Sequence, residues 1–212
     1  MIGAIAWREA RRGFSGAAWL PVAFFLLIAT IVPFAVGPDA RLLARIGGGA
    51  LWIAALTAAL LPIDRLIEPD RAEGIFDQLA LTGAAEEAVG AAKMVGHWLT
   101  FGPLLLLASV PASFLVGLDG QALGRSLVAL AVGTPALAAL AVTVAALTAG
   151  LPRAGSLAGL LLMPLAVPLV IFGAAATGDG ESSALMLEAA VALLTVAGAP
   201  FVTGAAIRAA RT

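Results

Sequence analysis

Six long apolar stretches dominate this sequence of 212 residues and limit what it can fold into. Their approximate limits are 17–37, 46–63, 94–117, 126–149, 156–177 and 184–206. About 20 mostly apolar residues in a helix cross the hydrocarbon core of a bilayer, so each stretch predicts one membrane span. Apolar residues make up 61% of the chain, and a soluble fold could not hide so much apolar surface. The sequence therefore predicts an all-α polytopic membrane protein with six transmembrane helices in a single membrane domain, residues 1–212.

The distribution of Lys and Arg predicts the orientation of these spans. An even number of spans places both termini on one side of the membrane. Nine of the cations would lie on that side, and Arg41, Arg45 and Arg125 on the other. The nine are Arg8, Arg11, Arg12, Arg65, Arg71, Lys93, Arg153, Arg208 and Arg211. Because cytoplasmic links carry the excess of Lys and Arg, we expect a multi-pass protein of the bacterial inner membrane with both termini in the cytoplasm.

Residues 1–14 are too polar to insert into the bilayer. On a helical wheel, Trp7, Ala10 and Phe14 face one way, whereas Arg8, Glu9, Arg11 and Arg12 face the other. This pattern predicts an N-terminal interfacial helix on the cytoplasmic side.

The link 64–93 between spans 2 and 3 is the only stretch dense in charge. Pro69 suits the first turn of a helix, and Asp70 and Glu73 complement the helix dipole. Ile75, Phe76 and Leu79 then share one face of the helix. We expect a short cytoplasmic helix with an apolar knob and acidic flanks. A helix that lies on lipid would be basic, so this one is better suited to a groove on a protein partner.

Several side chains within the spans have two interpretations. His97, with Met94 one turn earlier, could ligate haem iron or cap the membrane interface beside Trp98. Trp52 fits an aromatic belt, or an outward contact for a partner or ligand together with Phe34. Pro135, Pro164 and Pro168 free backbone carbonyls inside their helices and indicate either static kinks or hinges.

Several kinds of chemistry are excluded or disfavoured. The chain has no cysteine, one histidine and no Gly-x-x-x-x-Gly-Lys loop, which leaves no thiol catalysis, no expected metal site and no ATP hydrolysis by this chain. No basic run interleaved with aromatics points to nucleic acid. Glu188 is assigned with Asp179 and Glu181 to a cation-free external loop. We expect no charge in the middle of any span, which disfavours a carrier that powers itself.

Motifs spread along most of the chain resemble the cytochrome c maturation protein B family. They are Pro33-Phe34-Ala35-Val36-Gly37-Pro38, Leu42 to Ile46, Trp52, Asp64-Arg65-Leu66, Asp70, Gly74, Gln78-Leu79, Lys93, His97-Trp98, Gly133-Thr134-Pro135 and Met163 to Phe172. The resemblance implies a non-catalytic, permease-type subunit of an ABC-family complex for c-type cytochrome biogenesis. It also implies three partners, namely an ATPase subunit, a Trp-rich membrane subunit that handles haem and a periplasmic haem chaperone. Haem and ATP would be handled by the complex, and we expect no cofactor bound directly by this chain.

Within such a complex, the link helix predicts the contact with the ATPase subunit. Phe76 and Leu79 would supply a buried anchor, and Gly74 would let the backbones approach. Asp70, Glu73 and Asp77 would pair with basic groups of the partner. The complex would either export haem or release haem-loaded chaperone. The alternative is a stand-alone channel or facilitator without an ATPase, and an intramembrane enzyme based on Ser156 is a more distant one.

Overall fold

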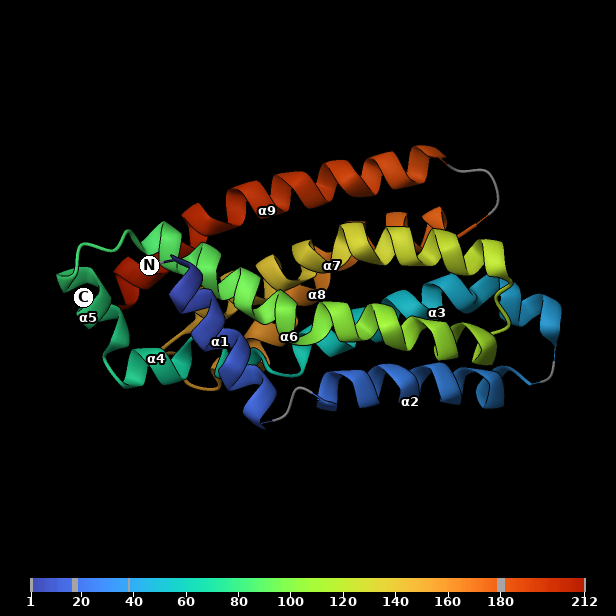
Figure 1. Cartoon of the computed structure of the whole chain (residues 1–212), viewed down its shortest axis with the longest axis horizontal. Helices are drawn as coiled ribbons and strands as arrows, with labels where there is room; N and C mark the ends of the chain where they lie inside the picture. Colours follow the sequence, from blue (N-terminus) through green and yellow to red (C-terminus); the bar gives the residue numbers. More distant parts are fainter. Residues whose placement is uncertain (1, 17–18, 38, 179–181, 212) are drawn as a thin grey trace.

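The computed structural model of the chain describes residues 2–16, 19–37, 39–178 and 182–211. Its regular elements are helical throughout these ranges, with no strand among them. The long helices run side by side as a bundle, and both chain termini lie at the same end of it (Figure 1). We call this end the terminal end. The all-helical prediction is confirmed.

Within the described ranges, six helices are long and apolar enough to cross a membrane, in agreement with the predicted number of spans. Their bounds are α2 Trp19–Val36, α3 Ala40–Leu60, α6 Glu86–Leu115, α7 Gly120–Thr148, α8 Ala154–Ala176 and α9 Ser182–Ala210. The predicted cores of the spans fall inside these helices. The largest difference is α6, which begins eight residues before the predicted span, because its first two turns are amphipathic rather than apolar.

Helix α7 lies at the centre of the bundle and packs against α3, α6, α8 and α9. Alanine is the commonest residue at its buried positions, which include Ala136, Ala138, Ala139 and Ala141. Small side chains let membrane helices approach closely, where van der Waals packing replaces the hydrophobic effect. The lipid-facing sides of the outer helices carry large exposed residues instead, such as Leu107, Leu160, Leu193 and Phe201.

Helix α1, Ile2–Gly16, lies across α6 at the terminal end (Figure 1). Ile5, Ala6 and Ala10 are buried, whereas Trp7 and Phe14 are more than half exposed. A β-carbon on Gly96 of α6 would lie 3.0 Å from the carbonyl oxygen of Ala6. The helix is amphipathic as predicted, but Ala10 belongs to the face on α6 and not to the face of Trp7 and Phe14.

The chain between α3 and α6 forms a short 3₁₀ helix, η1 (Ile63–Arg65), and two short helices, α4 (Glu68–Ala72) and α5 (Ile75–Leu81). We call residues 61–85 the linking segment. Pro69 occupies the first turn of α4, as predicted. The single short helix expected here is replaced by two, because Gly74 adopts a left-handed φ of 67° that ends one helix and begins the next.

Candidate functional site

Asp70 lies at the centre of a buried ion cluster that joins three separate parts of the chain. Its carboxylate is 2.9 Å from Arg8 and 2.7 Å from Arg12, both on α1, and 2.7 Å from Lys93 on α6. The Asp70 side chain is only 2% exposed. The hydrogen bond to Asp70 raises the pKa of Arg12 above its ordinary value. The cluster therefore fixes α4 to both α1 and α6.

Lys93 is the second buried charge of this cluster, with 3% of its side chain exposed. Its Nζ donates to the backbone carbonyl of Leu66, 2.8 Å away, and lies 3.2 Å from the Glu9 carboxylate. It also lies 5.7 Å from the centroid of the Phe76 ring, within cation–π distance. A buried ion is tolerable when its partners are complete, and removing one partner leaves an uncompensated charge.

A second group of ion pairs ties the linking segment to α9. Arg211 is 2.9 Å from Asp77 on α5 and 2.8 Å from Glu86 on α6. Arg208 is 2.6 Å from Glu87. These pairs are partly exposed, so each one contributes little to stability, but together they connect the last turn of α9 to α5 and α6.

A third connection reaches the link between α7 and α8. Glu68 accepts hydrogen bonds from the Arg71 guanidinium at distances down to 2.6 Å and from the backbone N–H of Gly150 at 3.0 Å. The linking segment is thus attached by polar contacts to α1, α6 and α9 and to the α7–α8 link. A force applied to it would reach most of the bundle.

The structure places the six residues predicted to contact an ATPase in different surroundings. Asp70 and Phe76 are buried within the chain, with Phe76 4% exposed, and Leu79 is half-buried against the same core. Gly74 forms the corner between α4 and α5. Only Glu73 and Asp77 are exposed, and they also pair with Arg12 and Arg211 of the chain itself.

Leu81 is the residue that sequence reasoning missed. Its side chain is 89% exposed at the end of α5, next to the exposed Thr82 and Gly83. The apolar periodicity of the segment does carry a signal, because Leu81 falls outside the face that Phe76 and Leu79 share. A leucine this exposed at the tip of the linking segment is an apolar contact point that the described part of the chain leaves uncovered.

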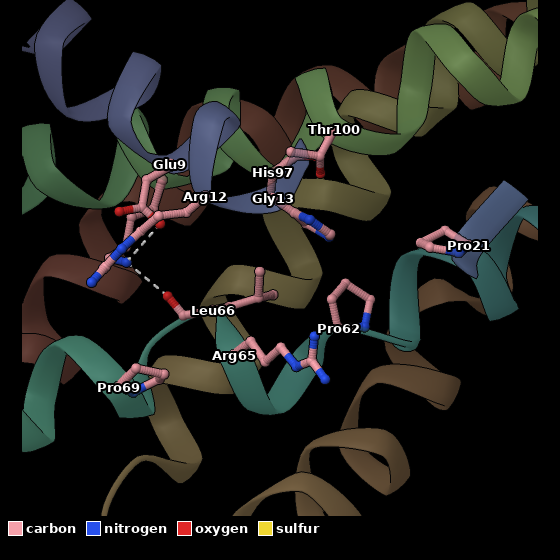
Figure 2. Close-up of a pocket in the computed structure, with 11 residues that line it drawn as sticks. Glu9, Arg12, Gly13, Pro21, Pro62, Arg65, Leu66, Pro69, His97 and Thr100 are labelled. Atoms are coloured by element: carbon pink, nitrogen blue, oxygen red, sulfur yellow. Dashed lines mark hydrogen bonds and ion pairs between the residues drawn. The ribbon is translucent and has the colours of Figure 1, made fainter. Parts of the chain in front are cut away.

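His97 lines a pocket of about 320 Å³ beneath α1 (Figure 2). Arg12 and Gly13 of α1 and Pro62, Arg65 and Leu66 of the linking segment also line it. The imidazole is 4% exposed and packs against Phe101, with the ring centroids 4.9 Å apart. Met94 is buried in the neighbouring apolar cluster and does not line this pocket. The fold does not bring the predicted His97 and Met94 pair together around one space.

Trp52 lies inside the bundle and not at its surface, so the predicted position in an aromatic belt or outward contact is wrong. It is 1% exposed, whereas Phe34 is 85% exposed. The indole fills the space beside two glycines, Gly133 of α7 and Gly173 of α8, where any β-carbon would overlap its ring. Because these two glycines have no side chains, α7 and α8 leave enough space between them for the indole ring.

Glu188 is a second correction, because it lies in α9 and not in an external loop. It is fully buried, six residues or roughly 9 Å into the helix. Neither carboxylate oxygen has a hydrogen-bond partner among the described residues. A β-carbon on Gly133 would lie 2.5 Å from Glu188 Oε1, which places the carboxyl beside Trp52. Glu188 therefore lies within the span but near its start, whereas the prediction concerned the middle of the spans.

The predicted hinge residues lie inside continuous helices. Pro135 is in α7, and Pro164 and Pro168 are one turn apart in α8. Their role as hinges stays a prediction. Within the described part of the chain, no group of three or more His, Asp or Glu side chains could hold a metal ion.

The fold defines a polytopic helical membrane protein. Its ion pairs and the hydrogen bonds of the linking segment concentrate at the terminal end. A family model described as CcmB protein matches residues 6–210. The chain belongs to the CcmB protein family, which confirms the resemblance found in the sequence.

Curated relatives named heme exporter protein B are similar over most of their length. The protein of Rhodobacter capsulatus is 44% identical over 195 residues, which cover 89% of each chain. That of Paracoccus denitrificans is 42% identical over 194 residues, again 89% of each chain. That of Escherichia coli K12 is 38% identical over 194 residues, covering 89% of this chain and 88% of the relative.

Proposed function

We propose that this chain is the permease-type subunit of an inner-membrane complex in c-type cytochrome biogenesis. Its relatives are named for haem export. The complex would also contain an ATPase subunit, a membrane subunit that handles haem and a periplasmic haem chaperone. ATP hydrolysis would drive either the export of haem or the release of haem-loaded chaperone. The chain itself has no phosphate-binding loop, so the energy comes from the partner.

The observation that carries this proposal is the attachment of the linking segment. The segment bears an exposed leucine at its tip, and ion pairs and hydrogen bonds attach the rest of it to α1, to α6, to Arg211 at the end of α9 and to the α7–α8 link. A segment that a partner could grip, and that cannot move without moving the bundle, is suited to transmit a conformational change. Closure of a nucleotide-bound ATPase dimer would supply that change.

The contact with the ATPase subunit would then differ from the one expected from the sequence. Leu81 would be the apolar anchor, with Glu73, Asp77 and Gln78 as its exposed polar surroundings. A single buried apolar anchor within a polar rim is a common arrangement in protein interfaces. Asp70, Phe76 and Leu79 would act indirectly by holding the segment in place.

The charge distribution supports a cytoplasmic location for the linking segment. The terminal end of the bundle carries nine of the 12 Lys and Arg residues, including Arg65 and Arg71 of the segment itself. Short links rich in Lys and Arg remain on the cytoplasmic side during insertion.

The test is a Leu81→Asp variant of the chain expressed with its partner subunits. We expect association with the ATPase subunit to weaken by about 2 kcal/mol, roughly thirtyfold, because a charge replaces the apolar anchor. Co-purification of the ATPase and the level of mature c-type cytochrome should fall together, while the amount of inserted protein stays the same.

Two variants serve as controls. Leu81→Met keeps an apolar side chain and should retain the ATPase. Leu151→Asp makes the same change at a half-exposed leucine of the α7–α8 link at the same end of the bundle. Full retention of the ATPase by Leu81→Asp, or its equal loss in Leu151→Asp, contradicts the assignment of the anchor.

A further inference from the structure

The end of the bundle opposite the termini contains a cavity of about 580 Å³. It lies between the first turns of α3 and α7 and the last turn of α8. Arg41, Arg45 and Arg125 all line it. These are the only cations at this end of the molecule, because the other nine lie at the terminal end. The basic charge of one membrane face is thus gathered in a single hollow.

Among the described residues that line the cavity, three are cationic and one, Asp119, is acidic. Arg41 and Arg45 are one helical turn apart, and like charges at this spacing repel each other. Neither forms an ion pair within the described part of the chain. The Asp119 carboxylate also caps α7 by accepting the N–H of Ala122 at 2.8 Å. Arg125 donates from Nε to the carbonyl of Thr177 at 3.0 Å, which holds it at the wall.

The rest of the lining is small and apolar. Leu118, Ala122, Ala174 and Ala175 form the wall. At Gly48 the helices α3 and α8 approach so closely that a β-carbon would lie 2.7 Å from Cβ of Thr177. The cavity combines basic groups with an apolar wall, and its volume falls within the range of small-molecule sites, about 300 to 1,000 Å³.

We propose that this cavity binds an amphiphilic anion through Arg41 and Arg45. Its carboxylate or phosphate groups would pair with the two guanidinium groups, which match the geometry of both anions. Its apolar body would lie against the alanines of α7 and α8. Arginine is depleted on the outer side of membrane proteins. Three arginines around one cavity on that side therefore indicate a binding role and not only a solvated surface. The site does not depend on the docking of an ATPase. The outward orientation of the cavity and the choice of a porphyrin as the first probe rest on the proposed function.

The test uses the full-length chain, with any subunits that co-purify, in nanodiscs of phosphatidylcholine. Mesoporphyrin IX, a fluorescent dicarboxylate, is titrated into the sample, and its uncharged dimethyl ester is titrated in parallel. We expect binding of the diacid, with an apparent Kd about tenfold weaker for each arginine removed in Arg41→Gln and Arg45→Gln. The double Arg→Lys variant should retain part of the affinity. Arg11→Gln, which removes an exposed arginine at the terminal end, should bind as the parent does.

A second arm distinguishes a lipid from a soluble ligand. Nanodiscs that include phosphatidylglycerol are analysed by native mass spectrometry for retained lipid. Retention by the parent and loss in the double Arg→Gln variant support the anion site and assign it to a lipid headgroup, even if no porphyrin binds. The proposal is overturned if lipid retention does not depend on the arginines and the porphyrin arm also fails. The porphyrin arm fails if the diacid and the ester bind equally, or if the double variant binds the diacid as the parent does. Failure of this site leaves the Leu81 result unaffected, and the reverse also holds.

Discussion

Asp70 is the residue on which the terminal end of the molecule depends most. Three cations from two helices converge on its carboxylate, and both it and Lys93 are almost completely buried. In water such pairs are weak, but removing one member of a buried pair leaves the other charge without compensation. The cluster is therefore a structural joint between α1, α4 and α6.

The substitution Asp70→Asn should destabilise the protein by about 3 to 5 kcal/mol, because Lys93 remains buried without its closest counter-charge. The expected readout is a lower thermal unfolding temperature in detergent and faster proteolysis within residues 61–85. Asp77→Asn is the matched control, since the Asp77 side chain is 63% exposed and its pair with Arg211 should contribute less than about 1 kcal/mol. An equal effect of the two substitutions would show that the cluster is not a joint.

Trp52 and Glu188 show where prediction from the sequence ends at the residue scale. Hydropathy counts residues and does not reveal which side of a helix faces the bundle, so Trp52 could equally be an anchor at the membrane interface. Its partners, Gly133 and Gly173, come from α7 and α8, far away in the sequence. Glu188 is a single carboxyl among apolar residues near the end of a predicted span, a pattern that is also typical of a loop. In the structure its side chain is fully buried.

At the scale of helices, the packing of α3 against α7 and α8 depends on bare backbone beside Trp52. A methyl group at position 173 would overlap the indole ring and force α8 away from α3. Gly159 belongs to the same helix, but its β-carbon would meet nothing within 4 Å. Substitutions at Gly173 and Gly159 are therefore expected to have different effects.

Gly173→Ala should lower the free energy of unfolding by about 1 to 3 kcal/mol through overpacking. Gly159→Ala should leave it unchanged or raise it by up to about 1 kcal/mol, because alanine has the higher helix propensity. Thermal unfolding of the two variants in the same detergent, followed by tryptophan fluorescence, measures both changes. The packing described here is incorrect if Gly173→Ala is as stable as Gly159→Ala.

The number of long helices and the position of Pro69 follow from the sequence, because apolar length and proline chemistry are local properties. The division of the linking segment into α4 and α5 does not. The apolar spacing of Ile75, Phe76 and Leu79 predicted a helix, and it did form one, but the same spacing could not show that the face is buried within the chain. That face turns inward because Lys93 and the apolar cluster at the terminal end lie beneath it.

For the whole molecule, coupling to a cytoplasmic ATPase requires the terminal end of the bundle to face the cytoplasm. The chain has no cysteine, so single-cysteine variants report one position each. Thr82 is exposed at the tip of the linking segment. Gln121 is exposed in the first turn of α7, at the end of the bundle opposite the termini. In intact spheroplasts, a membrane-impermeant maleimide should label Gln121→Cys and leave Thr82→Cys unlabelled until the membrane is opened. The reverse pattern would place the linking segment outside the cell.

The contact between the linking segment and an ATPase subunit is tested most directly by photo-crosslinking from position 81. The photoreactive amino acid benzoylphenylalanine replaces Leu81 in one sample and Phe34, which is 85% exposed at the opposite end, in another. Illumination of membranes that contain the whole complex should crosslink position 81, and not position 34, to the ATP-hydrolysing subunit. A crosslink to that subunit from position 34 alone, or from neither position while the ATPase still co-purifies, would contradict the proposed coupling.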